Sequence, residues 1–234
     1  MAMKRIFAIT LSALALPGAA IAATRTYDTG AFDKVAVSSG VEADISTGPA
    51  RSVRAETTAE NLDDLRISVK DNVLRIERSA SSWFSGWFEK RPDYKVHVVT
   101  PMLRGVDASS GTEVTVRGSL EGDFSAAASS GSELDVSGIK GGNVKAHSSS
   151  GSDLSIAGSC ISLEADASSG SDLDADDLKC ENVAVQASSG SDVSVAATKS
   201  IKGRASSGSD VRVKGKPPTV QVETSSGAHV VVKE

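Results

Sequence analysis

Hydrophobic and polar residues alternate with a period of two over the C-terminal half of the chain, and the alternation recurs at nearly fixed intervals. In one copy of the pattern, the odd-numbered residues are apolar or small: Ile161, Leu163, Ala165, Ala167, Ser169, Ser171, Leu173 and Ala175. The residues between them are polar, acidic or glycine. Other copies of the repeat, at 183–195 and 220–232, show the same alternation at the same place relative to the Ser-Ser-Gly triplet. A period of two predicts β-strands with one buried face.

The triplet Ser-Ser-Gly marks every copy of this pattern. It occurs eight times, and seven occurrences form an unbroken series whose glycines are Gly111, Gly131, Gly151, Gly170, Gly190, Gly208 and Gly227. A fixed spacing of 18 to 20 residues is typical of a solenoid, in which each repeat forms one coil. Residues 103–234 are therefore predicted to form an all-β, right-handed parallel β-solenoid (β-helix) of about seven coils. A flexible Ser/Gly linker would not need to keep the parity of its apolar positions.

The phase also predicts how each turn is built. The second serine of the triplet and the serine after the glycine share the parity of the apolar residues, so both are expected to point inward. The glycine has outward parity and is expected at a corner where the strand bends.

Residues 24–102 lack the repeat but contain strand patterns. Apolar alternation predicts strands near 32–37, 41–45, 52–56, 66–70, 73–77 and 94–99. Asp71 and Asn72 separate two of them and resemble a two-residue hairpin turn. We expect these strands to pair with each other as an N-terminal β cap over the first coil, because an uncovered terminal coil is an adhesive edge.

Residues 1–22 have the pattern of a secretory signal peptide that is removed on export. Lys4 and Arg5 precede an apolar stretch from Ile6 to Leu16, and Ala20-Ile21-Ala22 provides a small-x-small cleavage site. No cysteine follows directly, so no lipid anchor is expected, and no other stretch is predicted to span a membrane. The formal net charge of −5 argues against a nucleic-acid partner.

The two cysteines occupy equivalent places in consecutive repeats. Cys160 precedes Gly170, and Cys180 precedes Gly190, by the same interval. Neighbouring strands lie about 4.8 Å apart, which is within the Cα separation that a disulfide accepts. We expect a structural disulfide across one coil step in an oxidising compartment. Two free thiols, or metal ligation, are the alternatives.

An acidic residue recurs at one outward position of the repeat. The set is Glu113, Glu133, Asp153, Asp172, Asp192 and Asp210, and His229 replaces the acid in the last copy. Stacked carboxylates repel, so each is expected to accept hydrogen bonds from serine hydroxyls or backbone N–H groups, as in an Asx turn. Ca²⁺ ligation is the alternative, although calcium β-rolls place paired glycines and acids twice per coil. No metal or other cofactor is otherwise expected.

An aromatic segment interrupts the N-terminal strands. Trp83, Phe84, Trp87 and Phe88 lie within six residues. Such a loop either covers the end of the solenoid or is exposed as a contact site for a membrane surface, a sugar or a partner protein.

Catalytic chemistry has little support in the sequence. The three histidines, His97, His147 and His229, are far apart, and none belongs to a recognisable nucleophile motif. They also lack the spacing of a zinc site. The chain is therefore not expected to be an enzyme.

The order of motifs resembles one known family. Gly30–Val35, Ser39–Ile45, Asp71–Ile76 and Lys95–Pro101 are followed by repeated Ser-Gly-Ser-Asp turns. This order is similar to the putative auto-transporter adhesin head GIN domain family, over residues 24–234. The resemblance implies an exported bacterial β-helical protein. One departure is the turn, which reads Ser-Ser-Gly-Ser-Asp where the family often has Ser-Gly-Ser-Gly-Asp.

These observations favour an exported, non-enzymatic structural or binding module of the bacterial envelope, adhesive in kind and located in the periplasm or at the cell surface. Its expected partners are an envelope protein or glycan, or further copies of itself. The alternative is a polysaccharide-binding or polysaccharide-cleaving β-helix.

Overall fold

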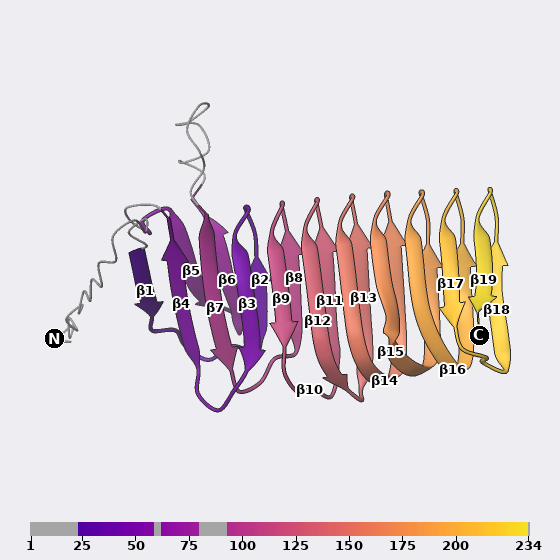
Figure 1. Cartoon of the computed structure of the whole chain (residues 1–234), viewed down its shortest axis with the longest axis horizontal. Coiled ribbons are helices and arrows are strands. Elements are labelled where there is room, and N and C mark those ends of the chain that lie inside the picture. The colour runs from indigo at the N-terminus through magenta and orange to yellow at the C-terminus, as the bar shows by residue number, and fades with distance from the viewer. Residues whose placement is uncertain (1–22, 59–61, 80–92, 234) are drawn as a thin grey trace, which may run out of the picture.

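The computed structural model describes residues 23–58, 62–79 and 93–233 as an all-β parallel solenoid with a mixed N-terminal sheet region (Figure 1). The predicted fold class is confirmed. No helix occurs among these residues, and so none of them forms a helix able to cross a membrane. The predicted signal peptide and the predicted aromatic contact loop lie outside the described residues.

Two facing stacks of parallel strands make up the solenoid. The first, here the leading sheet, consists of strands that run into the Ser-Ser-Gly turns. Its members are β2 (Lys34–Val37), β8 (Gly105–Ser109), β11 (Phe124–Ser129), β13 (Asn143–Ser149), the C-terminal halves of β14 (Asp153–Ser168), β15 (Asp172–Ala187) and β16 (Asp192–Ala205), and β18 (Thr219–Thr224).

The second stack, the trailing sheet, consists of the strands that leave the turns. Its members are β3 (Glu42–Thr47), β9 (Glu113–Arg117), β12 (Glu133–Lys140), the N-terminal halves of β14, β15 and β16, β17 (Asp210–Lys214) and β19 (His229–Lys233). The short β10 (Leu120–Glu121) pairs with β12 at the edge opposite the turns.

The N-terminal strands close one end of this stack. β6 (Val73–Arg78) continues the leading sheet next to β2, and β7 (Tyr94–Thr100) continues the trailing sheet next to β3. β5 (Leu65–Lys70) then pairs antiparallel with β6 through the predicted Asp71-Asn72 hairpin. β4 (Ser52–Thr57) pairs antiparallel with β7, and β1 (Ala23–Tyr27) pairs with β4.

The coil formed by β2 and β3 lies between strands that follow it in sequence. β6 and β7 flank it on one side, and β8 and β9 flank it on the other. Its turn, Ser38-Ser39-Gly40, stacks directly on the first turn of the repeat array, because Gly40 N donates to Ser110 O at 3.0 Å. All eight Ser-Ser-Gly turns therefore form one column.

Each turn uses two successive residues in the left-handed region. In the sixth turn along the chain, Ser189 has φ 56° and Gly190 has φ 70°, and the other seven turns are alike. Positive φ at both central residues is the requirement of a type I′ turn, whose twist matches that of the flanking strands. The glycine N–H bonds to the second serine's carbonyl of the next turn, as from Gly190 to Ser207 at 3.0 Å.

The prediction that the second serine of each Ser-Ser-Gly triplet points inward is wrong. Ser110, Ser130, Ser150, Ser169, Ser189 and Ser207 are all exposed. The two left-handed residues project from the edge of the solenoid, so the alternation stops at the second serine and resumes after the glycine.

The prediction for the residue after the glycine is confirmed. Ser132, Ser152, Ser171, Ser191 and Ser209 are at most 2% exposed. Each hydroxyl donates to a backbone carbonyl of the preceding coil: Ser132 to Ala108 and Ser152 to Ala128 at 2.9 Å, for example. The buried hydroxyls thus bond adjacent coils together, which satisfies them inside an apolar core.

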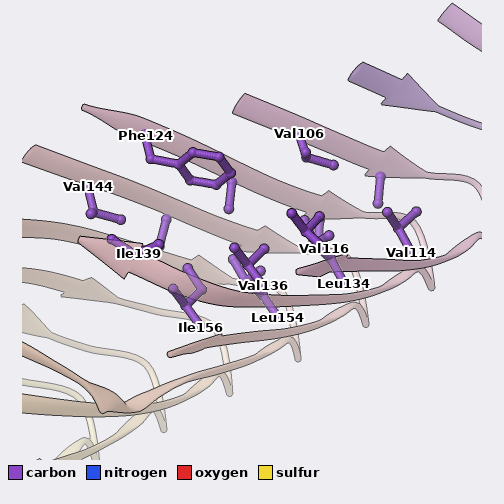
Figure 2. Close-up of a cluster of buried hydrophobic side chains, with 14 of the residues drawn as sticks. Val106, Val114, Val116, Phe124, Leu134, Val136, Ile139, Val144, Leu154 and Ile156 are labelled. Atoms are coloured by element: carbon purple, nitrogen blue, oxygen red, sulfur yellow. The ribbon is translucent and has the colours of Figure 1, made fainter. Parts of the chain in front are cut away.

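The core is a narrow space between the sheets, filled by columns of aliphatic residues (Figure 2). Val114, Leu134 and Leu154 stack through the trailing sheet, and Phe124 and Val144 stack through the leading sheet. Because parallel strands in register place each side chain over its counterpart, repeats of Val, Leu, Ile and Ala fill most of the interior, with few aromatic side chains such as Phe124.

Ile161 departs from its predicted inward position and is 54% exposed. Gly158, with φ 141°, coincides with a register shift of β14 against β12, and Cys160 then occupies the buried position. Cys160 and Cys180 face each other on β14 and β15, with their Cα atoms 4.5 Å apart, and form the predicted disulfide.

Candidate binding face

The predicted acidic positions form one column on the outer side of the trailing sheet. Strand pairing places Glu113 beside Glu133, and continues through Asp153, Asp172, Asp192 and Asp210 to His229. Glu42 of β3 pairs with Glu113 and extends the series. We call these seven carboxylates, Glu42, Glu113, Glu133, Asp153, Asp172, Asp192 and Asp210, the acidic column.

Glu42 was missed because its turn lies outside the periodic array. Its sequence signal is the same as that of the other members, since it stands two residues after Gly40, as Glu113 stands two residues after Gly111. What the sequence did not show is that β2 and β3 fold back into the stack.

A second column runs beside the first, two residues further along each strand. It reads Asp44, Thr115, Asp135, Ser155, Asp174 and Ser194, with Arg212 after it. Carboxylates and hydroxyls alternate here, so successive acids are two coil steps apart and their repulsion is weaker. The two columns together define the acidic face.

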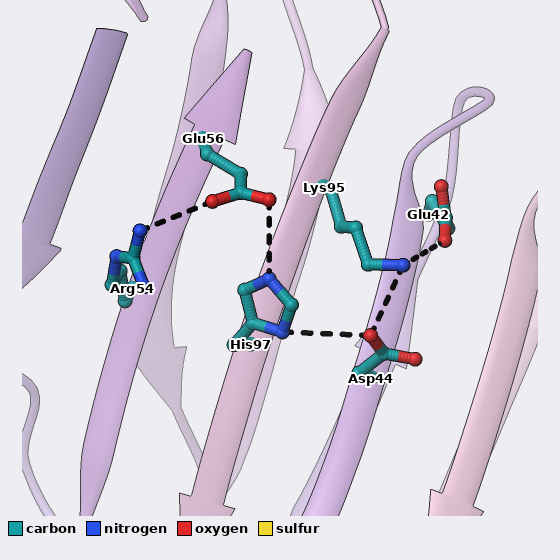
Figure 3. A network of polar contacts seen from close by, with 6 residues as sticks. All are labelled: Glu42, Asp44, Arg54, Glu56, Lys95 and His97. Carbon is teal, nitrogen blue, oxygen red and sulfur yellow. Dashed lines mark hydrogen bonds and ion pairs between the residues drawn. The ribbon is translucent and has the colours of Figure 1, made fainter. Parts of the chain in front are cut away.

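The two ends of the acidic column are neutralised by cations. At one end, the ammonium group of Lys95 binds Glu42 and also lies 3.1 Å from Asp44, and these bonds raise the pKa of Lys95 (Figure 3). At the other end, the guanidinium of Arg212 lies 3.4 Å from Asp192 and 3.9 Å from Asp210.

The middle of the column has no such partner. Among the described residues, no lysine or arginine forms an ion pair with Glu113, Glu133, Asp153 or Asp172. Burial, and then the charges of Asp153 and Asp192, raise the pKa of Asp172 above its ordinary value of 3.8, while Arg212 lowers it. The centre of this face is therefore a row of carboxylates without an ion pair in the described part of the chain.

The predicted capping bonds are not formed in the described part of the chain. Where a serine follows the turn glycine, its hydroxyl donates inward to a backbone carbonyl, as Ser152 does to Ala128, and is turned away from the carboxylates. The backbone N–H groups of the acids join the strand ladder, as from Asp153 to Ser132 O at 2.9 Å.

The alternative of calcium ligation gains no geometric support. Within residues 23–58, 62–79 and 93–233, no group of three or more His, Cys, Asp or Glu side chains is arranged to hold a metal ion. Side chains stacked along one line point outward in parallel, whereas Ca²⁺ needs six to eight oxygens around one point.

The histidines are placed apart by the fold. His97 on β7 lies between two carboxylates, with Nδ1 3.5 Å from Asp44 and Nε2 3.4 Å from Glu56, which in turn binds Arg54 (Figure 3). His147 lies on the leading sheet beside Asp166, and His229 ends the acidic column. Both ring nitrogens of His97 thus face acids, so the ring is held as part of a charge network.

The outer side of the leading sheet differs in charge. Lys145 lies 3.1 Å from Glu164, and Arg204 lies 2.9 Å from Glu223. A shallow hollow of about 840 Å³ on this side is lined by both signs of charge, including Glu164, Lys202 and Arg204. The acidic face has a smaller groove of about 250 Å³, lined in part by Asp135, Asp174 and Arg117. The molecule therefore presents one balanced side and one acidic side.

Comparison with known proteins agrees with this architecture. The model of the family described as "Putative auto-transporter adhesin, head GIN domain" matches residues 31–217. A comparison with curated proteins finds no match.

Solved structures share the fold at low sequence identity. The crystal structure of a putative adhesin from Bacteroides fragilis superposes with a TM-score of 0.79 at 16% identity, over 91% of this chain and 97% of that one. A putative lipid binding protein from Parabacteroides distasonis gives 0.67 at 14% identity, over 90% and 96%. A putative adhesin from Parabacteroides merdae gives 0.64 at 16% identity, over 91% and 96%. At these identities the likeness concerns the fold.

Proposed function

Because this chain belongs to the putative auto-transporter adhesin head GIN domain family, we propose that it is an exported, non-enzymatic binding module of the bacterial envelope whose acidic face contacts the partner. The Cys160–Cys180 disulfide and the family membership both indicate an extracytoplasmic location. The periplasm and the cell surface are the two places that fit the sequence pattern of residues 1–22.

The observation that carries the proposal is the unpaired middle of the acidic column. Four successive carboxylates, Glu113, Glu133, Asp153 and Asp172, lie on neighbouring strands without a cationic partner among the described residues. Their mutual repulsion is a cost to folding, and yet the repeat keeps an acid at this position in every coil except the last, which has His229. A line of fixed charge on a rigid sheet suits a long partner that carries positive charge at several points, such as an envelope protein or an amine-bearing glycan.

The form of the surface supports binding over catalysis. The grooves on both sides are open and shallow, and their linings combine charged and small polar side chains. A catalytic site would instead place a nucleophile or an acid–base pair in a recess that encloses the substrate. His97, the histidine with the most contacts, is held between Asp44 and Glu56 instead.

The test compares the mature protein with two charge-matched variants in the capture of solubilised envelope fractions and in binding to a glycan array. The first variant, Glu133→Gln/Asp153→Asn/Asp172→Asn, removes three charges from the acidic column. The control, Asp107→Asn/Glu164→Gln/Asp166→Asn, removes three from the leading sheet. Loss of binding only in the first variant supports the proposal.

Two results would contradict the proposal that the acidic face contacts the partner. Equal loss in both variants would mean that only net charge matters. Retained binding in the column variant, together with loss in Trp83→Ser/Phe84→Ser/Trp87→Ser/Phe88→Ser, would move the contact to the aromatic loop. Circular dichroism on each variant establishes that it is folded.

A further inference from the structure

The last coil of the solenoid leaves apolar side chains and strand edges uncovered. In the described part of the chain, β18 pairs only with β16, and β19 pairs only with β17. Val220 and Val232 are each 46% exposed, whereas the residues they stack on, Ile201 and Val213, are fully buried. Val231, 47% exposed, lies on the outer side beside Arg212. The sheets therefore stop with half of their hydrogen-bonding edge and part of their core open (Figure 1).

We propose that this end is a self-association surface, at which two copies of the chain join tail to tail. β18 of one copy would lie antiparallel beside β19 of the second copy, and the reverse pair would form at the same time. Such an interface is isologous and closes as a dimer.

The two edges are complementary in their hydrophobic residues. The inward positions of β18 are Val220 and Val222, and those of β19 are Val230 and Val232. Antiparallel alignment with matched faces brings Val220 opposite Val232 and Val222 opposite Val230, so the core columns continue from one copy into the other.

The same alignment also sets polar residues opposite each other on the outside. Glu223 of β18 comes opposite His229 of β19, and Thr219 comes opposite Lys233. The other isologous arrangement, β19 against β19, would set His229 opposite Lys233, which is a like-charge pair when the histidine is protonated. In the β18–β19 arrangement, neither of the two pairs joins like charges.

Head-to-tail growth lacks a comparable surface. The opposite end of the stack is formed by the antiparallel β1 and β5, and none of the exposed large hydrophobic residues in the described chain lies on either strand. Leu65 on β5 is 5% exposed, and Ile67 and Val69 pack against the core. An open filament would need an apolar surface at both ends, whereas one open end gives a closed pair.

The first test measures the mass of the mature protein in solution over a range of concentrations by sedimentation velocity. The expected species has the mass of two chains. Val220→Lys/Val232→Lys, which puts charge on the two exposed inward positions, is expected to abolish it. Ile161→Lys is the matched control, because Ile161 is equally exposed but lies away from this end, and it is expected to keep the dimer.

The second test does not depend on the stability of the Val220→Lys/Val232→Lys variant. Both native cysteines are in the disulfide, so Val220→Cys/Val232→Cys adds thiols at two positions that the proposed interface places opposite each other between copies. Oxidation is expected to give a covalent dimer and nothing larger, whereas Val220→Cys alone gives none. A monomer at all concentrations, a dimer that survives the lysine pair, or a covalent ladder beyond two chains would each overturn the proposal.

Discussion

Gly40 and Ser110 lie on adjacent turns of the solenoid, with the N–H of Gly40 donating to the carbonyl of Ser110 at 3.0 Å, although six strands separate them in sequence. This bond joins the isolated first Ser-Ser-Gly triplet to the seven of the repeat array. It also places Glu42 at the head of the acidic column, next to Lys95. The column of turns and the column of acids are consequences of the same stacking.

Two glycines are expected to differ in their sensitivity to alanine. At Gly190 a Cβ would meet nothing within 4 Å. Gly190→Ala therefore lowers the stability of the fold only because alanine disfavours the left-handed backbone conformation, by about 1–2 kcal/mol. At Gly203 a Cβ would lie 1.8 Å from Val185 O, so Gly203→Ala also forces two coils apart and costs about 3 kcal/mol or more. Urea unfolding of both variants measures the difference, and equal costs would contradict the close approach at Gly203.

Thr112 and Ser152 occupy the same buried position after the glycine but have opposite hydrogen-bonding states. The Thr112 hydroxyl is buried without a partner, whereas Ser152 donates to Ala128 O at 2.9 Å. Thr112→Val is expected to stabilise the fold by about 1 kcal/mol, because it removes an unsatisfied group at constant shape. Ser152→Ala is expected to destabilise it by a similar amount. Thermal unfolding checks both signs; a destabilised Thr112→Val protein would argue that the threonine hydroxyl has a partner.

The disulfide closes a loop with a sequence separation of 20. The loss of loop-closure entropy in the unfolded chain predicts a stabilisation of about 3 kcal/mol. Cys160→Ser/Cys180→Ser should therefore unfold at lower denaturant, and reductant should shift the wild-type transition toward that of the variant. A reductant-insensitive wild type would show that the bond contributes little to stability.

Asp172 is expected to destabilise the fold in its charged form. Its folded-state pKa lies above the ordinary value of 3.8, because of burial and the neighbouring Asp153 and Asp192. A raised carboxyl pKa means that the penalty is present above the folded pKa and vanishes as the pH falls below the unfolded one.

Asp172→Asn should therefore stabilise the protein at neutral pH by about 0.5 kcal/mol, since exposed charges are screened. The gain should shrink with added salt and disappear in acid, which urea unfolding across pH and ionic strength measures. Asp107→Asn is a useful comparison, because burial is the first cause of the raised pKa at both residues, whereas the charged neighbours of Asp107, Lys34 and Arg75, lower its pKa. A salt-independent gain at Asp172 would rule out repulsion within the column.

Much of the solenoid follows from local patterning. The alternation of apolar and polar residues predicted the strands and the burial of Ser152 and its equivalents. The equal distances of Cys160 and Cys180 from the glycines of their repeats predicted the disulfide. The outward rotation of Ser189 did not follow, because parity counting assumes extended backbone and this turn has two left-handed residues. The prediction for Ile161 failed because the buried positions change parity between Cys160 and Leu163, where β14 passes from the trailing sheet to the leading sheet.

The candidate site was predictable only in part. Parity identified the six repeat acids, but the places of Glu42 and Asp44 depend on β3 lying between β7 and β9, which is a long-range arrangement. The pairing of Arg212 with Asp192 likewise depends on the alignment of two coils rather than on local sequence.

The most direct measurement of the proposed function is the binding of solubilised envelope material to immobilised mature protein at low and high ionic strength, side by side with Glu133→Gln/Asp153→Asn/Asp172→Asn. If the middle of the acidic column makes the contact, wild-type binding falls as salt rises, and the variant binds weakly at both salt concentrations. Binding that is insensitive to salt and unchanged in the variant would contradict a role for the acidic column in recognition.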